Sequence, residues 1–69
     1  MSYIAGWYQV TAWTIKDYPY TKVFPTEQEA RAFGNEQYKL SFVRKVTISK
    51  MRYYKKRRAS QLIAEAEKR

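Results

Sequence analysis

The sequence predicts a small α+β domain with the element order β-β-α-β-α, a three-stranded sheet with one helix packed on it and a basic C-terminal helix. Aromatic and β-branched residues concentrate in three segments, as is typical of strands. Between the second and third of these, apolar residues recur at helical spacing. The chain is 45% hydrophobic and 17% aromatic, which indicates a folded core rather than a disordered basic tail. Residues 1–69 are therefore expected to form one domain, with a ββαβ core at 1–54 and a helix at 55–69.

The first two predicted strands form an antiparallel hairpin. Residues 3–16 (YIAGWYQVTAWTIK) and 20–24 (YTKVF) flank a turn that contains Asp and Pro. The alternation within the first strand groups three side chains on one face: Tyr8, Val10 and Ala12. The opposite face carries Trp7 and Trp13, and the alternation leaves open whether this face is covered or exposed.

The predicted helix begins after Pro25. The Thr26 hydroxyl is placed to accept a hydrogen bond from the Glu29 amide, as in a capping box. One stripe of the helix then faces the hairpin: Ala30, Phe33, Gly34, Gln37 and Tyr38. Gly34 costs about 1 kcal/mol relative to Ala in a helix interior, so we expect it to serve a close approach of helix to sheet.

The third predicted strand spans residues 42–54 (FVRKVTISKMRYY). Val46 and Ile48 are expected to face the core. The alternate residues then face away: Lys45, Thr47, Ser49, Met51 and Tyr53.

Residues 55–69 (KKRRASQLIAEAEKR) have the composition and spacing of a helix. A narrow apolar stripe consists of Ala59, Leu62, Ile63 and Ala66. This stripe needs a covering surface, and the simplest expectation is that the helix lies on the sheet as a lid. A homodimer through Leu62 and Ile63 is the alternative, with a membrane-surface helix as a weaker one.

All of the excess charge of +8 falls between residues 44 and 58, a stretch that contains no acid. Its bases are Arg44, Lys45, Lys50, Arg52, Lys55, Lys56, Arg57 and Arg58. Clustered bases without interleaved acids create a positive potential that attracts polyanions or acidic protein surfaces. The stretch therefore predicts a binding surface.

Aromatic residues lie among or near these bases. Tyr53, Tyr54 and Trp13 are candidates to stack on nucleic-acid bases while the cations contact phosphates, a combination that single-stranded nucleic acids use. The leading interpretation is a non-enzymatic module that binds RNA or single-stranded DNA. No helix-turn-helix, KH loop or RNP motif occurs in the chain, so sequence-specific readout is not predicted.

Several other functions lack the residues they require. The chain contains no Cys and no His, which removes the common zinc and copper ligands and the usual nucleophile and base pairs. Its only glycines, Gly6 and Gly34, do not form a phosphate-binding loop. We therefore expect no catalytic residues, metal, cofactor or small-molecule substrate, and in the absence of a leader-like or membrane-spanning segment we expect a cytoplasmic protein.

A second interpretation uses the same basic residues against carboxylates. A very small domain with one dense basic patch fits the general character of virus-encoded inhibitors that dock on an acidic or nucleic-acid-binding surface of a host protein, such as a polymerase or a CRISPR nuclease. Arg, Tyr and Trp would be the anchors of such an interface. A nucleic-acid binder retains naked oligonucleotides at physiological salt, whereas an inhibitor of this kind binds them weakly. A third interpretation is an assembly subunit that forms a stable oligomer.

Overall fold

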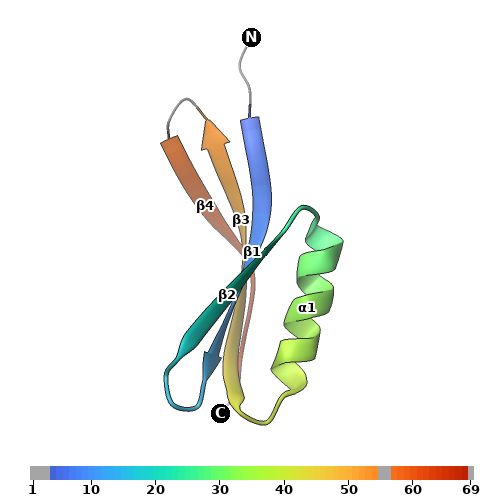
Figure 1. Cartoon of the computed structure of the whole chain (residues 1–69), viewed down its shortest axis with the longest axis vertical. Coiled ribbons are helices and arrows are strands. Elements are labelled where there is room, and N and C mark those ends of the chain that lie inside the picture. The colour runs from blue at the N-terminus through green and yellow to red at the C-terminus, as the bar shows by residue number, and fades with distance from the viewer. Residues whose placement is uncertain (1–3, 55–56, 69) are drawn as a thin grey trace.

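The structure, a computed structural model, describes residues 4–54 and 57–68 and contains four strands and one helix in the order β-β-α-β-β (Figure 1). The elements are β1 (Ile4–Thr14), β2 (Pro19–Phe24), α1 (Glu27–Lys39), β3 (Val43–Tyr54) and β4 (Arg57–Glu67). The class is α+β, as predicted, but the sheet has one strand more and the described chain one helix fewer than the sequence indicated.

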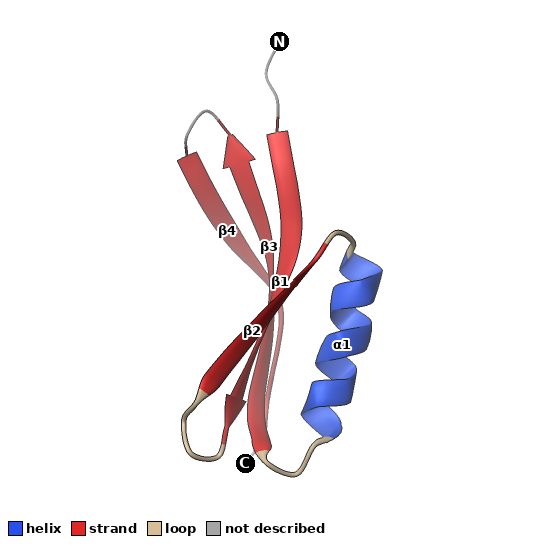
Figure 2. Ribbon diagram, in the orientation of Figure 1, coloured by secondary structure: helices blue, strands red, loops and turns tan. Residues whose placement is uncertain are grey.

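The four strands form a single antiparallel sheet in the order β2-β1-β3-β4, and α1 lies across one face of it (Figure 2). Val10 of β1 pairs with Lys22 of β2 on one side and with Ile48 of β3 on the other. Ile48 in turn pairs with Ala64 of β4. The molecule thus has two layers, and in the described part of the chain α1 is the only element that covers the sheet.

The core lies between α1 and the two central strands. Its fully or almost fully buried residues are Val10, Ala12, Ala30, Val43, Val46 and Ile48. Partly buried side chains surround this cluster: Tyr8, Tyr20, Phe24, Phe33, Tyr38, Ile63 and Ala64. The predicted inward faces of the first and third strands are confirmed. Phe33 lies at the margin of the core, where its ring packs 5.2 Å from that of Phe24.

The start of α1 is also confirmed, since the Thr26 hydroxyl accepts a hydrogen bond from the Glu29 amide at 3.3 Å. Gly34 is buried against the sheet, and a Cβ atom at this position would lie 3.1 Å from the Cδ1 atom of Ile48. Such a separation is tighter than ordinary van der Waals contact. Gly34 therefore allows the helix to approach β3 closely, as the sequence suggested.

Replacement of Gly34 with Leu is expected to destabilise the fold by about 1 to 3 kcal/mol, because the larger side chain must push α1 away from Ile48. Glu36→Leu is the matched control: the same side chain is added to an exposed position of the same helix, where the expected change is within about 0.5 kcal/mol. Urea unfolding monitored by circular dichroism measures both. Equal stability of the two variants would contradict the close packing.

The predicted helix at residues 55–69 is wrong, because residues 57–67 form the edge strand β4. Helix propensity is a weak preference that tertiary pairing overrides. Here β3 offers a free edge of 12 residues, and β4 pairs with it from Arg57 to Glu67. Residues 55, 56 and 69 of the predicted helix lie outside the described residues.

A β-bulge interrupts the alternation of side chains along β4. The pairing with β3 shifts between Ile48 and Ser49, which pair with Ala64 and Leu62 respectively, so that Ile63 is the extra residue. Both Ile63 and Ala64 therefore pack toward the core, which breaks the two-residue alternation of a regular strand. Positive charge at the N-terminus of a helix is unfavourable because of the helix dipole. Arg57 and Arg58 avoid this unfavourable interaction because they begin a strand.

Candidate nucleic-acid interface

A three-stranded arm projects beyond the helix-covered part of the sheet. Strand β2 ends at Phe24, which pairs with Tyr8, so beyond this row the sheet consists of β1, β3 and β4 alone. We call this three-stranded part, together with the row that contains Tyr8 and Lys50, the arm: residues 4–8, 50–54 and 57–61. Figure 1 shows these strand ends extending past the first turn of α1, and the molecule measures 47 Å along its longest axis but only 15 Å along its shortest.

The arm concentrates the positive charge of the protein. It carries Lys50, Arg52, Arg57 and Arg58 and no acidic residue. Lys55 and Lys56 fall between its second and third segments in the sequence but lie outside the described residues. Apart from the arm and these two lysines, the chain has eight bases and all six acids, so its charge is nearly balanced. An anion that approaches the arm therefore encounters attraction without competing carboxylates nearby in the sequence.

The bases of the arm are distributed over both faces of its sheet. One face of the arm continues the face of the sheet on which α1 packs. On this face Arg52 pairs with Ala59 and is a diagonal neighbour of Arg57. Lys50 lies on the same face, and its Nζ atom is 5.9 Å from the centre of the Tyr8 ring. Arg58 lies on the opposite face. Diagonal neighbours in a sheet are about 7 to 8 Å apart, so cations on one face can contact successive phosphates.

The face away from the helix joins an aromatic pair to a cation. Tyr53 pairs directly with Arg58 and is a diagonal neighbour of Trp7, which pairs with Met51. Tyr53 is 45% exposed and Trp7 is partly buried. The alternation of β1 left open whether the face that carries Trp7 and Trp13 is covered. In the described part of the chain no helix covers it. Trp7 and Tyr53 thus form a potential stacking surface beside Arg58.

Arg44 lies at the opposite end of β3 from the arm. At about 3.3 Å per residue, the separation of eight positions between Arg44 and Arg52 spans about 26 Å. The guanidinium of Arg44 bonds to Asp17 at 2.7 Å and to Glu67 at 3.2 Å. This predicted binding residue therefore ties the turn after β1 to the end of β4, and its charge is matched by two carboxylates.

Lys45 and Trp13 are also apart from the arm. They pair across β1 and β3, and the Nζ atom of Lys45 lies 5.3 Å from the centre of the Trp13 ring. The same Nζ atom is 3.9 Å from a carboxylate oxygen of Glu65. Both predicted site residues are thus engaged within the protein, whereas Trp7, which the prediction did not include, lies on the arm. Strand alternation groups Trp7 with Trp13, but only the pairing with β3 distinguishes them.

Of the two predicted stacking tyrosines, Tyr53 lies on the face of the sheet away from α1. Tyr54 is the next residue of β3 and pairs with Ile4 and Arg57. Four of the predicted bases, Lys50, Arg52, Arg57 and Arg58, lie together on the arm. The structure therefore divides the predicted site in two. Arg44 and Lys45 lie beside carboxylates at one end of the sheet, whereas the bases of the arm have no acid on the arm to offset their charge.

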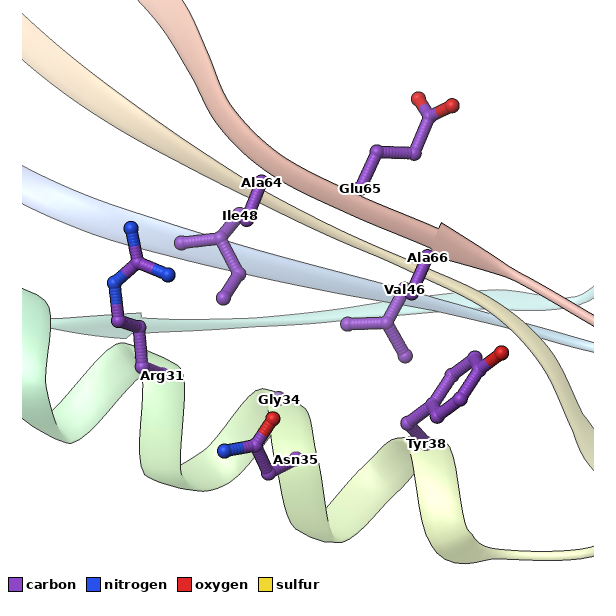
Figure 3. A pocket seen from close by; sticks show the side chains of 9 residues that line it. All are labelled: Arg31, Gly34, Asn35, Tyr38, Val46, Ile48, Ala64, Glu65 and Ala66. Atoms are coloured by element: carbon purple, nitrogen blue, oxygen red, sulfur yellow. The ribbon is translucent and has the colours of Figure 1, made fainter.

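A shallow groove separates α1 from β4 on the helix side of the sheet (Figure 3). Its floor is formed by Val46, Ile48, Ala64 and Ala66, and Arg31, Asn35 and Tyr38 line it from the helix. The groove has a volume of about 160 Å³. Ligand pockets commonly enclose about 300 to 1,000 Å³, so this groove is small for a substrate site. It results from the alanines of β4, which leave space beside the helix.

The described residues contain no group of three or more Asp and Glu side chains placed to hold a metal ion. Within residues 4–54 and 57–68 no helix has the length and apolar character needed to cross a membrane. No protein-family model, curated protein or solved structure matches this chain.

Proposed function

We propose that this protein is a non-enzymatic nucleic-acid-binding module that uses its arm to hold RNA or single-stranded DNA. The observation that supports the proposal is the combination of four bases and no acid on one projecting piece of sheet, with Trp7 and Tyr53 on its uncovered face. The proposal includes a cytoplasmic location and requires no cofactor or small-molecule substrate.

Phosphate contacts supply most of the affinity in this mechanism. Lys50, Arg52 and Arg57 on one face, with Arg58 on the other, would neutralise backbone phosphates and release counterions. Such contacts carry no sequence information. The expected binding is therefore strongly dependent on salt and tolerant of sequence.

Stacking distinguishes single strands from duplexes. A base that is not paired can lie on the exposed ring of Tyr53 while its phosphate meets the neighbouring Arg58. In a duplex the base faces are occupied by their neighbours and this contact is lost. Single-stranded RNA and DNA are therefore expected to bind more tightly than duplex DNA of equal charge.

The direct test is fluorescence anisotropy of labelled single-stranded RNA, single-stranded DNA and duplex DNA, titrated between about 50 and 200 mM salt. Retention of the single strands at the upper end of this range supports the proposal. Loss of all binding there would contradict it and favour the alternative, in which the arm docks on an acidic protein surface. An affinity pull-down that enriches one acidic protein would then identify that partner.

Replacement of Tyr53 with Ala is expected to weaken single-strand binding by about 5- to 150-fold, because one stacked base is worth about 1 to 3 kcal/mol. Tyr18→Ala is the matched control: Tyr18 is 70% exposed in the turn after β1, remote from the arm, and its removal is expected to leave the affinity unchanged. The same anisotropy titration measures both. Equal affinities for the two variants would exclude stacking on Tyr53.

A further inference from the structure

The two edges of the sheet differ in how they are protected against pairing with another strand. The edge strand β2 has only six residues, begins at Pro19 and is followed by Pro25. Short length and flanking prolines are common protections of a sheet edge. The other edge, β4, has 11 residues and contains no proline. Its outer backbone groups are therefore available along the whole strand in the described structure.

The charges of β4 are segregated along its length. Arg57 and Arg58 lie at its start, and Glu65 and Glu67 lie at its end. Antiparallel pairing of β4 with β4 of a second copy brings the basic half of each strand beside the acidic half of the other. Parallel pairing in register places like charges side by side, which is unfavourable. The charge pattern of this edge is thus complementary to itself in one orientation.

We propose that β4 is a homodimerisation edge, which pairs antiparallel with β4 of a second copy about a two-fold axis near Leu62 and Ile63. In this register Arg58 lies opposite Glu67 of the second copy and is a diagonal neighbour of its Glu65. The register with β3 places Arg58, Glu65 and Glu67 on the same face of the sheet, the face away from α1. All three side chains can therefore meet across the new pair of strands.

The centre of the interface is apolar. Leu62 is 55% exposed in the single chain, and the two-fold axis brings it beside the second copy. The bulge at Ile63 also falls at this centre. Residues 57–61 of each copy then pair with residues 64–68 of the other as uninterrupted segments on either side of the axis. The product is a continuous eight-strand sheet with one arm at each end.

This inference rests on β4 itself and does not require that the protein bind nucleic acid. Arg58 belongs to both surfaces, however. Bound nucleic acid and the second copy compete for its guanidinium, so a nucleic acid that uses Arg58 is expected to shift the equilibrium toward the monomer.

Charge reversal provides the test, with sedimentation velocity of the protein alone as the measurement. Wild-type protein is expected to show a concentration-dependent monomer–dimer equilibrium. Arg58→Glu, and separately the double variant Glu65→Lys/Glu67→Lys, are each expected to weaken dimerisation at least about tenfold, because like charges then face each other. An equimolar mixture of the two variants restores complementary pairs and is expected to recover the dimer as a heterodimer.

Lys22→Glu on the opposite edge is the control and is expected to leave dimerisation unchanged. Circular dichroism verifies that each variant is folded. If the double variant fails to fold because Arg44 and Lys45 lose their partners, Arg58→Glu alone decides the question. A wild-type protein that stays monomeric at all accessible concentrations would overturn the inference, as would a dimer that tolerates Arg58→Glu without loss.

Discussion

Joint replacement of Lys50, Arg52, Arg57 and Arg58 with glutamine is expected to reduce the affinity for single-stranded RNA by at least about 100-fold at low salt. These four residues are the bases of the arm in the described structure, and no acid lies on the arm to offset them. Each phosphate contact on a single strand contributes about 0.7 to the slope of log affinity against log salt, so the slope is expected to become shallower by about 2 to 3. Anisotropy titrations at several salt concentrations give both quantities.

The control removes the same total charge elsewhere. Lys16, Lys22, Arg31 and Lys39 lie outside the arm, and their joint replacement with glutamine also lowers the net charge from +8 to +4. If the arm is the binding site, this variant retains the wild-type salt slope and most of the affinity. Equal losses in the two variants would show that attraction depends on net charge alone, which contradicts a localised site.

The arm variant is expected to keep its fold. Lys50 is only partly buried, and Arg52, Arg57 and Arg58 are exposed. Glutamine retains part of the aliphatic stem of each side chain, and the contact that it removes from Lys50 is that of the Nζ atom with the partly buried Tyr8 ring. Unchanged melting temperatures for both variants allow the affinity difference to be assigned to the arm.

The first three strands and the helix were predictable because their signals are local. Alternation in β1 and β3 identified the inward faces, and the Thr26 cap marked the start of α1. The final segment was not predictable in the same way. Its alanines and charged residues favour a helix locally, while the competing stabilisation comes from the free edge of β3 and becomes visible only once the sheet is assembled.

The basic residues of the candidate site could be identified from the sequence, but not which of them lie together in the fold. The acid-free run of the sequence suggested one patch, yet Asp17 and Glu67 from distant segments reach Arg44 at one end of the sheet. Ion pairs between residues 23 to 27 positions apart leave no local signal. The same limit applies to Trp7, because only strand register places it diagonal to Tyr53.

Ile48→Ala is expected to destabilise the protein by about 2 to 5 kcal/mol, the range for truncation of a buried Ile or Leu. Ile48 is 6% exposed, and the Cβ of any residue replacing Gly34 would contact its side chain, so this residue joins α1 to β3. The free energy of unfolding is roughly 0.05 to 0.15 kcal/mol per residue, which gives about 3 to 10 kcal/mol for a chain of this length. One truncation can therefore remove most of the stability.

Ile15→Ala is the matched control for this substitution. Ile15 is 64% exposed after the end of β1, and the bond from its backbone amide to the Phe42 carbonyl at 2.8 Å does not depend on the side chain. The same deletion of atoms is therefore expected to cost less than about 1 kcal/mol. Urea unfolding measures the free energy of unfolding of both variants, so it compares the same truncation at a buried and at an exposed position. A small and equal effect would mean that Ile48 is not packed beneath α1, and it would also remove the physical basis for the buried Gly34.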